Sequence, residues 1–429
     1  MKTRIINLFV VAVMVVAALP LATAGIATAQ DEITINVLTM DQAGMTPEEF
    51  DEITARFEEM HPGVNVEVTY VLYDGLHDLI VTSVSSDPPA FDLILVDDIW
   101  FSEFADAGWI LDVSDRITDE MREGIFDAAW GVSQVGGVDY GLPWLLDQKY
   151  FFYNTRMLEE AGFDAPPKTW EELEEQARVM KDMGLVEYPM IWSWAQIEAV
   201  VPDFVSLVYG NGGEFFDENN EPVFNSPEGV GALQWMVDMI NEGIVNPSSI
   251  TSAEEDVRNV FSQGNAAFAT NWLYMYDLAN SPEESQVAGE VGITLIPVFE
   301  SVVEERASAT CNGSMGFAIT AGSPHPDEAW AFLEYLTSEE IQIEFSAHQL
   351  PIWETAFEKE ELIALNPVTV PVFAEQFEWA EVRPKVPYYN EASRLIQIAI
   401  QEALTGRATP QEALDEAVAQ IKEVAEEYK

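Results

Sequence analysis

Aromatic residues beside turns, with carboxylates close by, are the features of this sequence best suited to holding a ligand. The chain has 12 tryptophans, and several stand where a strand pattern gives way to a loop. These places are Asp97-Asp98-Ile99-Trp100, Pro143-Trp144, Trp192-Ser193-Trp194 and Asn271-Trp272-Leu273-Tyr274. A flat ring stacks on the apolar C–H face of a sugar, and an ionised carboxylate accepts strong hydrogen bonds from its hydroxyls. The pattern favours carbohydrate binding, although core packing is the alternative for any single tryptophan.

Several catalytic chemistries have no matching pattern in the sequence. The four histidines are too far apart for a zinc-hydrolase motif: they are His61, His77, His325 and His348. The single cysteine, Cys311, excludes an internal disulfide and a cysteine-based metal cluster. We therefore expect no metal, no cofactor and no enzyme. A secreted glycosidase stays open as an alternative, because it needs only two carboxylates and the chain has 75.

The charge of the chain limits its partners. With 75 Asp+Glu against 19 Lys+Arg, the formal net charge is -56. Such a surface repels phosphate backbones and anionic lipids, so we expect no binding to nucleic acid or to a membrane surface. The acids are spread along the chain, which fits adaptation to high salt, where screening removes self-repulsion. The other interpretation of the acidity is a cationic ligand, such as a polyamine.

The amino terminus has the layout of a secretory signal peptide. Lys2 and Arg4 precede the apolar run 5–19, which is shorter than the roughly 20 residues that a membrane-spanning helix needs. Ala27-Thr28-Ala29 predicts a signal peptide over 1–29 with cleavage after Ala29, and Ala22-Thr23-Ala24 is the competing site. No cysteine near either site can take a lipid. We therefore expect a periplasmic or secreted protein.

The elements that must position these residues are those of an α/β protein. Strand patterns over 33–39, 64–70 and 91–96 alternate with helix patterns, which is typical of a mostly parallel sheet. A strand over 150–154 follows, then helices dominate, and strands resume at 266–270, 291–296 and 316–319. Capping boxes predict helix starts at Thr46–Glu49, Thr337–Glu340 and Thr409–Glu412. The pattern predicts two lobes, with the chain crossing between them more than once.

Seven segments, taken in order, carry a family resemblance. They are FEEMHPGVNVEV (57–68), FDLILVDDIWFSEFADAGWILDVSD (91–115), YGLPWLLDQKYFFYNTRMLEEAGFDAPPKTWEEL (140–173), VYGNGG (208–213), FSQGNAAFATNWLYMYDLAN (261–280), HPDEAWAFLEYLTSEE (325–340) and RPKVPYYNEASRLIQIAIQEALTG (383–406). Together they resemble the family 1 extracellular solute-binding proteins of sugar ABC importers, and among these the trehalose/maltose-type binding proteins.

The resemblance implies a two-lobed periplasmic-binding-protein fold of the type II-like kind, whose lobes are joined by crossing hinge segments. One lobe would comprise 31–142 plus 300–350, and the other 143–299 plus 351–429. Such a protein would capture a di- or oligosaccharide by hinge closure and deliver it to the membrane permease subunits of an ABC importer. It would act as a monomer. A binding protein for a non-sugar, cationic solute stays open as an alternative.

The resemblance also implies residues for the site. Asp97 and Asp147 match acceptors of sugar hydroxyls on facing lobes. Trp272 and Tyr274 match stacking aromatics, and Gly313 matches a position whose backbone approaches the ligand.

Other candidates follow less directly from the resemblance. Met315 stands where many relatives have a tryptophan, and the segment with Asp41 and Gln42 aligns poorly with one that holds a further polar contact. Trp144 and Trp194 are candidates for extra cleft aromatics, with core packing as the alternative. Arg383 either meets the ligand or pairs with one of the many acids.

Overall fold

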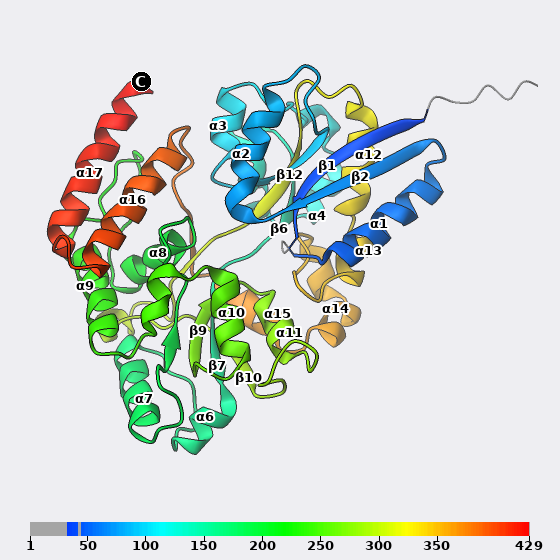
Figure 1. The fold of residues 1–429 in the computed structure, drawn as a ribbon. Coiled ribbons are helices and arrows are strands. Elements are labelled where there is room, and N and C mark those ends of the chain that lie inside the picture. Colours follow the sequence, from blue (N-terminus) through cyan, green and yellow to red (C-terminus); the bar gives the residue numbers. More distant parts are fainter. Residues whose placement is uncertain (1–31, 42–43, 429) are drawn as a thin grey trace, which may run out of the picture.

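The computed structural model describes residues 32–41 and 44–428, which form two α/β lobes (Figure 1). The expected signal peptide over 1–29, its cleavage after Ala29, and the candidate Gln42 lie outside the described residues. Within the described ranges, no helix is both long and apolar enough to cross a membrane.

The first lobe is built on a five-stranded sheet in the order β2-β1-β3-β12-β6. Its strands are β1 (Ile33–Met40), β2 (Val64–Val71), β3 (Leu93–Asp97), β6 (Leu142–Leu145) and β12 (Met315–Ile319). β1 runs parallel to β2 and β3, whereas β12 is antiparallel to both of its neighbours. All five residues of β3 are buried, as expected for a strand inside a covered sheet.

Helices surround this sheet. They are α1 (Pro47–Met60), α2 (Tyr73–Val84), α3 (Phe101–Asp106), α4 (Asp119–Gly124), α5 (Asp127–Ser133), α12 (Pro326–Leu336) and α13 (Glu339–Glu344), with the hairpin β4 (Gln134–Val135) and β5 (Val138–Asp139). Two of the predicted capping boxes are confirmed, at Thr46–Glu49 and Thr409–Glu412. The box predicted at Thr337 is wrong, because that hydroxyl donates to the Leu333 carbonyl and α13 begins after Ser338.

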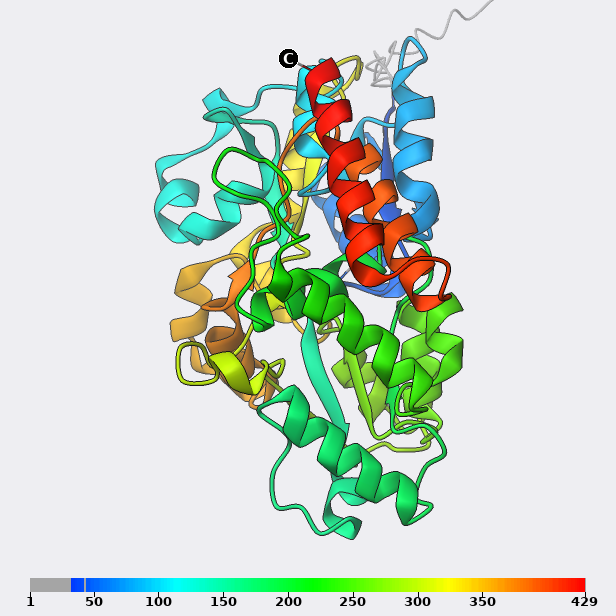
Figure 2. The same cartoon turned by 90° about the vertical axis from the view of Figure 1, so that its left-hand side faces the viewer.

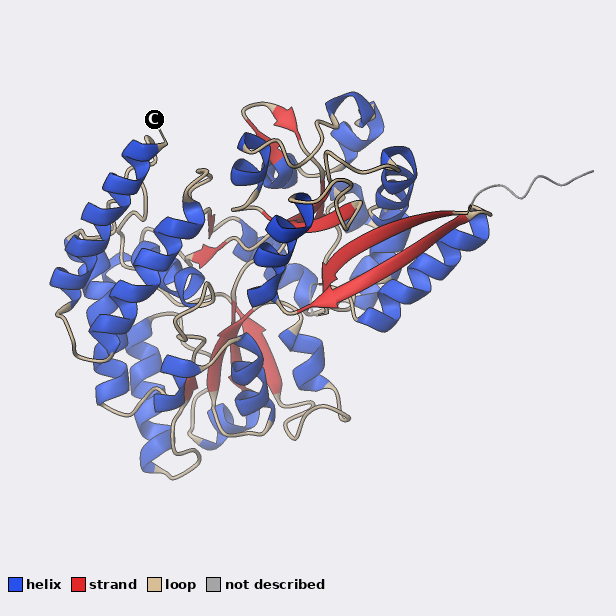
Figure 3. Cartoon of the chain, turned by 45° about the horizontal axis from the view of Figure 1, so that its top comes forward, coloured by secondary structure: helices blue, strands red, loops and turns tan. Residues whose placement is uncertain are grey.

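The second lobe is built on a four-stranded sheet in the order β10-β7-β9-β8. Its strands are β7 (Tyr150–Asn154), β8 (Met190–Ile191), β9 (Phe268–Asn271) and β10 (Val291–Thr294). Its helices are α6 (Thr155–Glu160), α7 (Trp170–Asp182), α8 (Val200–Gly210), α9 (Pro227–Asn241), α10 (Glu254–Ser262), α11 (Met275–Asn280), α15 (Thr369–Phe377), α16 (Tyr389–Leu404) and α17 (Pro410–Glu427). Figure 3 shows the strands in separate groups with helices around them.

The carboxyl-terminal helices belong with the second lobe. α16 packs on α17, and both pack on α9 (Figure 2). The remaining short elements are α14 (Glu360–Leu365), β11 (Thr310–Cys311), β13 (Ala380–Glu381) and the 3₁₀ turns Ser114–Arg116, Pro247–Thr251, Glu300–Val302 and Glu354–Glu358.

Crossing segments join the two lobes side by side. Backbone hydrogen bonds link 147–149 to 311–313: the Lys149 amide donates to Cys311 (3.3 Å) and the Gly313 amide donates to Asp147 (2.9 Å). β11 pairs in turn with β13. The expected first boundary, between 142 and 143, needs correction, because β6 pairs with β12 in the sheet of the first lobe. The chain therefore leaves that lobe after Leu145.

Candidate ligand-binding site

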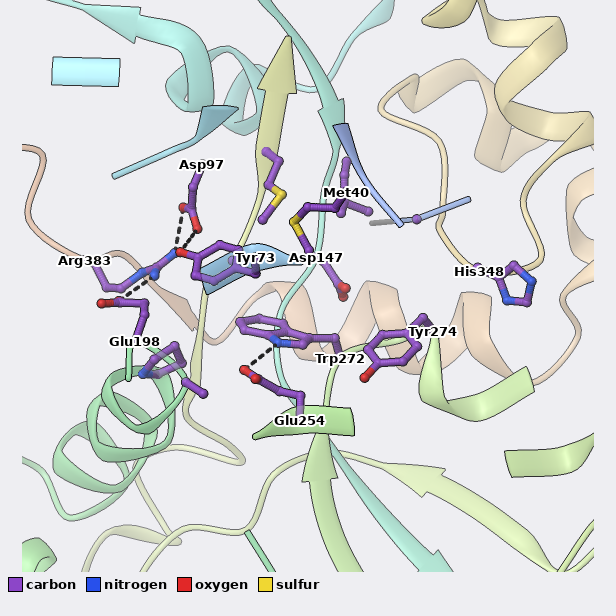
Figure 4. Close-up of a pocket in the computed structure, with 16 residues that line it drawn as sticks. Met40, Tyr73, Asp97, Asp147, Glu198, Glu254, Trp272, Tyr274, His348 and Arg383 are labelled. Carbon is purple, nitrogen blue, oxygen red and sulfur yellow. Dashed lines mark hydrogen bonds and ion pairs between the residues drawn. The ribbon is translucent and has the colours of Figure 1, made fainter. Parts of the chain in front are cut away.

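A cavity lies between the two lobes, at the carboxyl end of β3 (Figure 4). Its walls enclose about 720 Å³ of space that no protein atom fills, part of it open to solvent. The lining residues come from both lobes and from the crossing segments: Met40, Gly44, Tyr73, Asp97, Leu145, Asp147, Glu198, Ala199, Pro202, Glu254, Trp272, Tyr274, Gly313, Met315, His348 and Arg383. A concave, mostly apolar cavity with a few polar groups is the usual form of a small-molecule site.

Two neighbours fix the position of the Trp272 indole: the ammonium group of Lys149 lies over the ring, and Gly313 packs against it. The ammonium group of Lys149, which is fully buried, lies 5.0 Å from the centre of the ring. Lys149 also contacts Asp203 at 3.1 Å, so its charge is paired. The indole N–H donates to Glu254 (3.3 Å). These contacts fix the orientation of the ring before any ligand arrives, which lowers the entropy lost on binding.

Gly313 is the residue that allows this placement of Trp272. A Cβ atom at position 313 would lie 2.3 Å from two carbon atoms of the indole. No real Cβ contact is that short, so any side chain at 313 has to displace the ring.

We therefore expect Gly313→Ala to weaken ligand binding about tenfold, with little effect on stability, because the cost falls on the position of Trp272. Isothermal calorimetry measures this loss. Gly75→Ala is the matched control, since a Cβ at Gly75 meets nothing within 4 Å. Unchanged affinity in Gly313→Ala would show that the position of the indole does not matter.

Tyr274 is fixed next to Trp272 by its hydroxyl, which donates to Glu255 (2.6 Å). Glu255 is itself paired with Arg258 at 2.8 Å. The phenol therefore presents its ring rather than its hydroxyl to the cavity, and Figure 4 shows the ring beside that of Trp272. Two neighbouring aromatic faces form the wall of the second lobe.

Arg383 connects acids from both lobes at one end of the cavity. Its guanidinium contacts Asp97 (3.0 Å) and Asp98 (3.2 Å) on the first lobe and Glu198 (2.9 Å) on the second. The arginine side chain is only 2% exposed. Burial raises the pKa of Asp98 to about 7, although Lys385 and Arg383 favour its ionised form. Both alternatives for Arg383 therefore hold, because it pairs with acids and also lines the cavity.

Asp97 has both of its carboxylate oxygens engaged. One accepts a hydrogen bond from the Tyr73 hydroxyl (2.7 Å), and the other accepts one from Arg383 (3.0 Å). Tyr73 stacks on Trp100, with ring centres 5.3 Å apart. In β12, Met315 stands directly opposite Asp97 and also lines the cavity.

Asp147 is the carboxylate of the cavity that has no ion-pair partner within 4 Å among the described residues. It is 5% exposed, and one oxygen accepts a hydrogen bond from the Gln148 amide (2.9 Å). Burial raises the pKa of Asp147 to about 8, against the opposite effect of backbone hydrogen bonds and of Lys149. A buried carboxyl group without a cation is well suited to hydrogen-bond with a bound hydroxyl, because its oxygens accept and the protonated form also donates.

Seven of the predicted site residues therefore line one cavity: Asp97, Asp147, Trp272, Tyr274, Gly313, Met315 and Arg383. The prediction of cleft positions for Trp144 and Trp194 is wrong. Trp144 is fully buried in the first lobe against Phe50 and Phe317, and Trp194 is fully buried in the second lobe, stacked on Trp192. Asp41 is not part of the lining, although Met40 and Gly44 on either side of it are.

The comparison with protein families agrees with this geometry. A family described as bacterial extracellular solute-binding protein matches residues 43–343. The chain belongs to this family. It is therefore a binding protein rather than an enzyme, and the family places it outside the cytoplasm.

Solved structures resemble this solute-binding protein over almost its whole length. Maltose-bound MalE3 of T. maritima is 28% identical with a TM-score of 0.85, covering 91% of this chain and 100% of that chain. An ABC transporter solute-binding protein of Thermotoga lettingae, bound with α-D-tagatose, is 27% identical with a TM-score of 0.82, covering 91% and 99%. The maltotriose-binding protein of Pyrococcus abyssi is 23% identical in sequence, covering 83% of this chain and 74% of the relative.

Four polar residues of the solute-binding protein's cavity escaped the sequence prediction. They are Tyr73, Glu198, Glu254 and His348. Tyr73 and Glu254 are the first residues of α2 and α10. Helix starts that directly follow strands face ligands in α/β proteins, so the position of Tyr73 after β2 was the available signal. Among the described residues, no group of three or more His, Cys, Asp and Glu side chains is placed to hold a metal ion.

Proposed function

We propose that this solute-binding protein captures a di- or oligosaccharide outside the cytoplasmic membrane and delivers it to the permease of an ABC importer. The observation that carries the proposal is the cavity wall of Trp272 and Tyr274 facing the unpaired carboxylate of Asp147. Aromatic faces bind the apolar side of sugar rings, and a carboxylate binds their hydroxyls. Two relatives, the maltose-bound protein of T. maritima and the maltotriose-binding protein of Pyrococcus abyssi, support the same ligand class.

Binding would act by selecting a closed arrangement of the lobes. Trp272 and Tyr274 belong to the second lobe, whereas Tyr73 and Met315 belong to the first. A ligand can touch both pairs together only when the lobes are close, so it favours the closed state by the free energy of the contacts made there. No bond of the sugar is made or broken in this mechanism. The closed form would then be the one that the permease recognises.

Calorimetry of the purified protein tests the ligand class. The panel contains glucose, maltose, trehalose, sucrose and maltotriose, with spermidine as the cationic candidate. We expect saturable binding of at least one sugar of two or more rings, and chromatography afterwards should recover the sugar intact. Binding of spermidine alone, or of nothing in the panel, would contradict the proposal.

Replacing Trp272 by alanine is expected to weaken binding of the best sugar by about 2 kcal/mol, close to 30-fold. The loss combines the stacking contact with apolar area that would otherwise be covered. Fluorescence titration or calorimetry gives the two affinities. Trp272→Phe keeps a ring and should lose less, while Trp109→Ala, on the first lobe outside this cavity, should change nothing.

A further inference from the structure

The two ends of the cavity differ in how their polar atoms are used. Arg383 marks one end and His348 marks the other, with Trp272 and Tyr274 between them (Figure 4). At the Arg383 end the acids already have protein partners. Glu198 accepts hydrogen bonds from Arg383 and Tyr389 on one oxygen and from Ser393 on the other. Asp97 is engaged on both oxygens as well.

At the His348 end polar atoms are buried without partners. The side chain of Gln349 is fully buried, and neither its amide nitrogen nor its amide oxygen forms a hydrogen bond within 32–41 and 44–428. Nδ1 of His348 and Oδ1 of Asp41 are buried and unpartnered in the same way. An unsatisfied buried polar group is unfavourable, and native proteins contain few of them.

Gln349 lies where the first lobe approaches the cavity. Gly44, which lines the cavity, lies so close to Gln349 that a Cβ at 44 would stand 1.8 Å from the amide oxygen. The Gln349 amide is therefore directly behind the cavity wall. Leu350 forms an isolated β-bridge with Leu146, which connects the segment 348–350 to a crossing segment between the lobes. We call residues 348–350 the strip.

A charged group of the second lobe faces His348, and it is in turn near a charged group of the first lobe. Asp277 on α11 of the second lobe interacts electrostatically with His348, and Glu49 on α1 of the first lobe interacts with Asp277. The imidazole thus stands at the junction of the lobes, where a bound molecule would be in contact with both.

We propose that His348, with Gln349 and Asp41 behind it, forms a second hydroxyl-binding subsite for a sugar ring that does not stack on Trp272. This inference rests on the proposed sugar function and makes it narrower, since it requires a ligand of at least two rings. His348 is the direct contact because it lines the cavity.

The chemistry of these groups suits neighbouring hydroxyls. An amide offers a donor and an acceptor side by side, and a neutral imidazole offers one of each. Sugar hydroxyls both donate and accept, so one ring can satisfy several of these atoms at once. At the Arg383 end the acidic side chains are already hydrogen-bonded to protein groups, so this end offers fewer polar atoms to a second sugar ring.

The experiment compares a disaccharide with its monosaccharide on variants of this strip. Calorimetry measures maltose and glucose binding to the full chain, to His348→Ala and to His325→Ala, a control at the start of α12 far from the cavity. We expect His348→Ala to lose at least tenfold in maltose affinity and less than twofold in glucose affinity. His325→Ala should match the unmodified chain for both sugars.

Each outcome separates this inference from the broader function. Equal losses for both sugars, or no loss, would overturn the subsite while leaving sugar binding intact. Tighter binding of glucose than of maltose by the unmodified chain would overturn it too. Binding of no sugar would overturn the proposed function itself. Gln349→Met, which keeps the volume and removes the amide, gives the same readout if His348→Ala fails to fold.

Discussion

Replacing Arg383 by methionine is expected to lower the free energy of unfolding by about 3–5 kcal/mol. The guanidinium lies between Asp97, Asp98 and Glu198. The two aspartates are 2% exposed or less. Arg383 alone among the described residues contacts all three acids, so its removal leaves Asp97 and Glu198 without a cation and Asp98 with only Lys385 at 3.8 Å. Urea denaturation without ligand measures the change.

Two further variants make this result specific to the ion-pair cluster. Arg407→Met removes an exposed guanidinium whose one hydrogen bond within the described part of the chain goes to Thr405, and its effect should stay within about 0.5 kcal/mol. Arg383→Lys keeps the charge, but an ammonium group cannot donate to all three acids as the guanidinium does. Its loss of stability should therefore lie between those of Arg407→Met and Arg383→Met. A loss below about 1 kcal/mol for Arg383→Met would mean that the acids are stabilised by other groups.

The Asp147→Asn variant is expected to be more stable than the unmodified chain, by a margin that increases with pH. Burial raises the pKa of Asp147 to about 8 in the folded protein, against a usual value of 3.8. Between about pH 4 and pH 8 the folded chain holds a proton that the unfolded chain has released. Unfolding therefore becomes easier as pH rises, by up to about 1.4 kcal/mol per pH unit from this group.

Thermal or urea denaturation at pH 5, 6, 7 and 8 checks the Asp147 prediction. Asparagine does not titrate, so the difference between the two proteins isolates the contribution of Asp147 even though other acids also titrate. Asp112→Asn is the control, because Asp112 is exposed and hydrogen bonds from Ser114 lower its pKa. Asp112 stays ionised throughout this range, and its variant should show a flat difference. If the stability difference between Asp147→Asn and the unmodified chain were also independent of pH, it would contradict a raised pKa for the buried Asp147 carboxyl.

The sequence was sufficient for much of the fold because local patterns carry it. Apolar patterns predicted β1, β2, β3 and β7 within a few residues, and capping boxes predicted the starts of α1 and α17. The boundary at 142 was less certain from sequence, since Leu142–Leu145 is a short apolar run that suits either sheet. Only its pairing with β12 assigns it to the first lobe.

The tryptophans show where sequence reasoning about the site stops. Trp272 and Trp194 both follow strand-like segments, yet one lines the cavity and the other is fully buried. The difference depends on which faces of the second lobe are covered by α16, a helix that lies some 200 residues later in the chain: Gln401 of α16 hydrogen-bonds to the Trp194 carbonyl. No local pattern encodes such a contact.

Two acids of the site, Glu198 and Glu254, were missed for a different reason. Glu198 and Glu254 are two among 75 acidic residues, and their neighbours in sequence do not distinguish them. What singles them out is three-dimensional: Glu198 meets Arg383, and Glu254 meets the Trp272 indole. The long-range partner selects the functional carboxylate, and only the fold supplies that partner.

The crossing segments also determine where the motion of this protein can best be observed. Asp147 and Gly313 lie in the hydrogen-bonded crossing segments between the lobes. When one lobe rotates about these segments, an atom moves further the greater its distance from the axis. Met60 and Met183, both 54% exposed, lie at the ends of α1 and α7 on opposite lobes: Met60 is the last residue of α1, and Met183 directly follows α7. The single native thiol, Cys311, is fully buried. Cysteines introduced at 60 and 183 would thus accept a pair of spectroscopic labels selectively, and the separation of the labels would report the angle between the lobes.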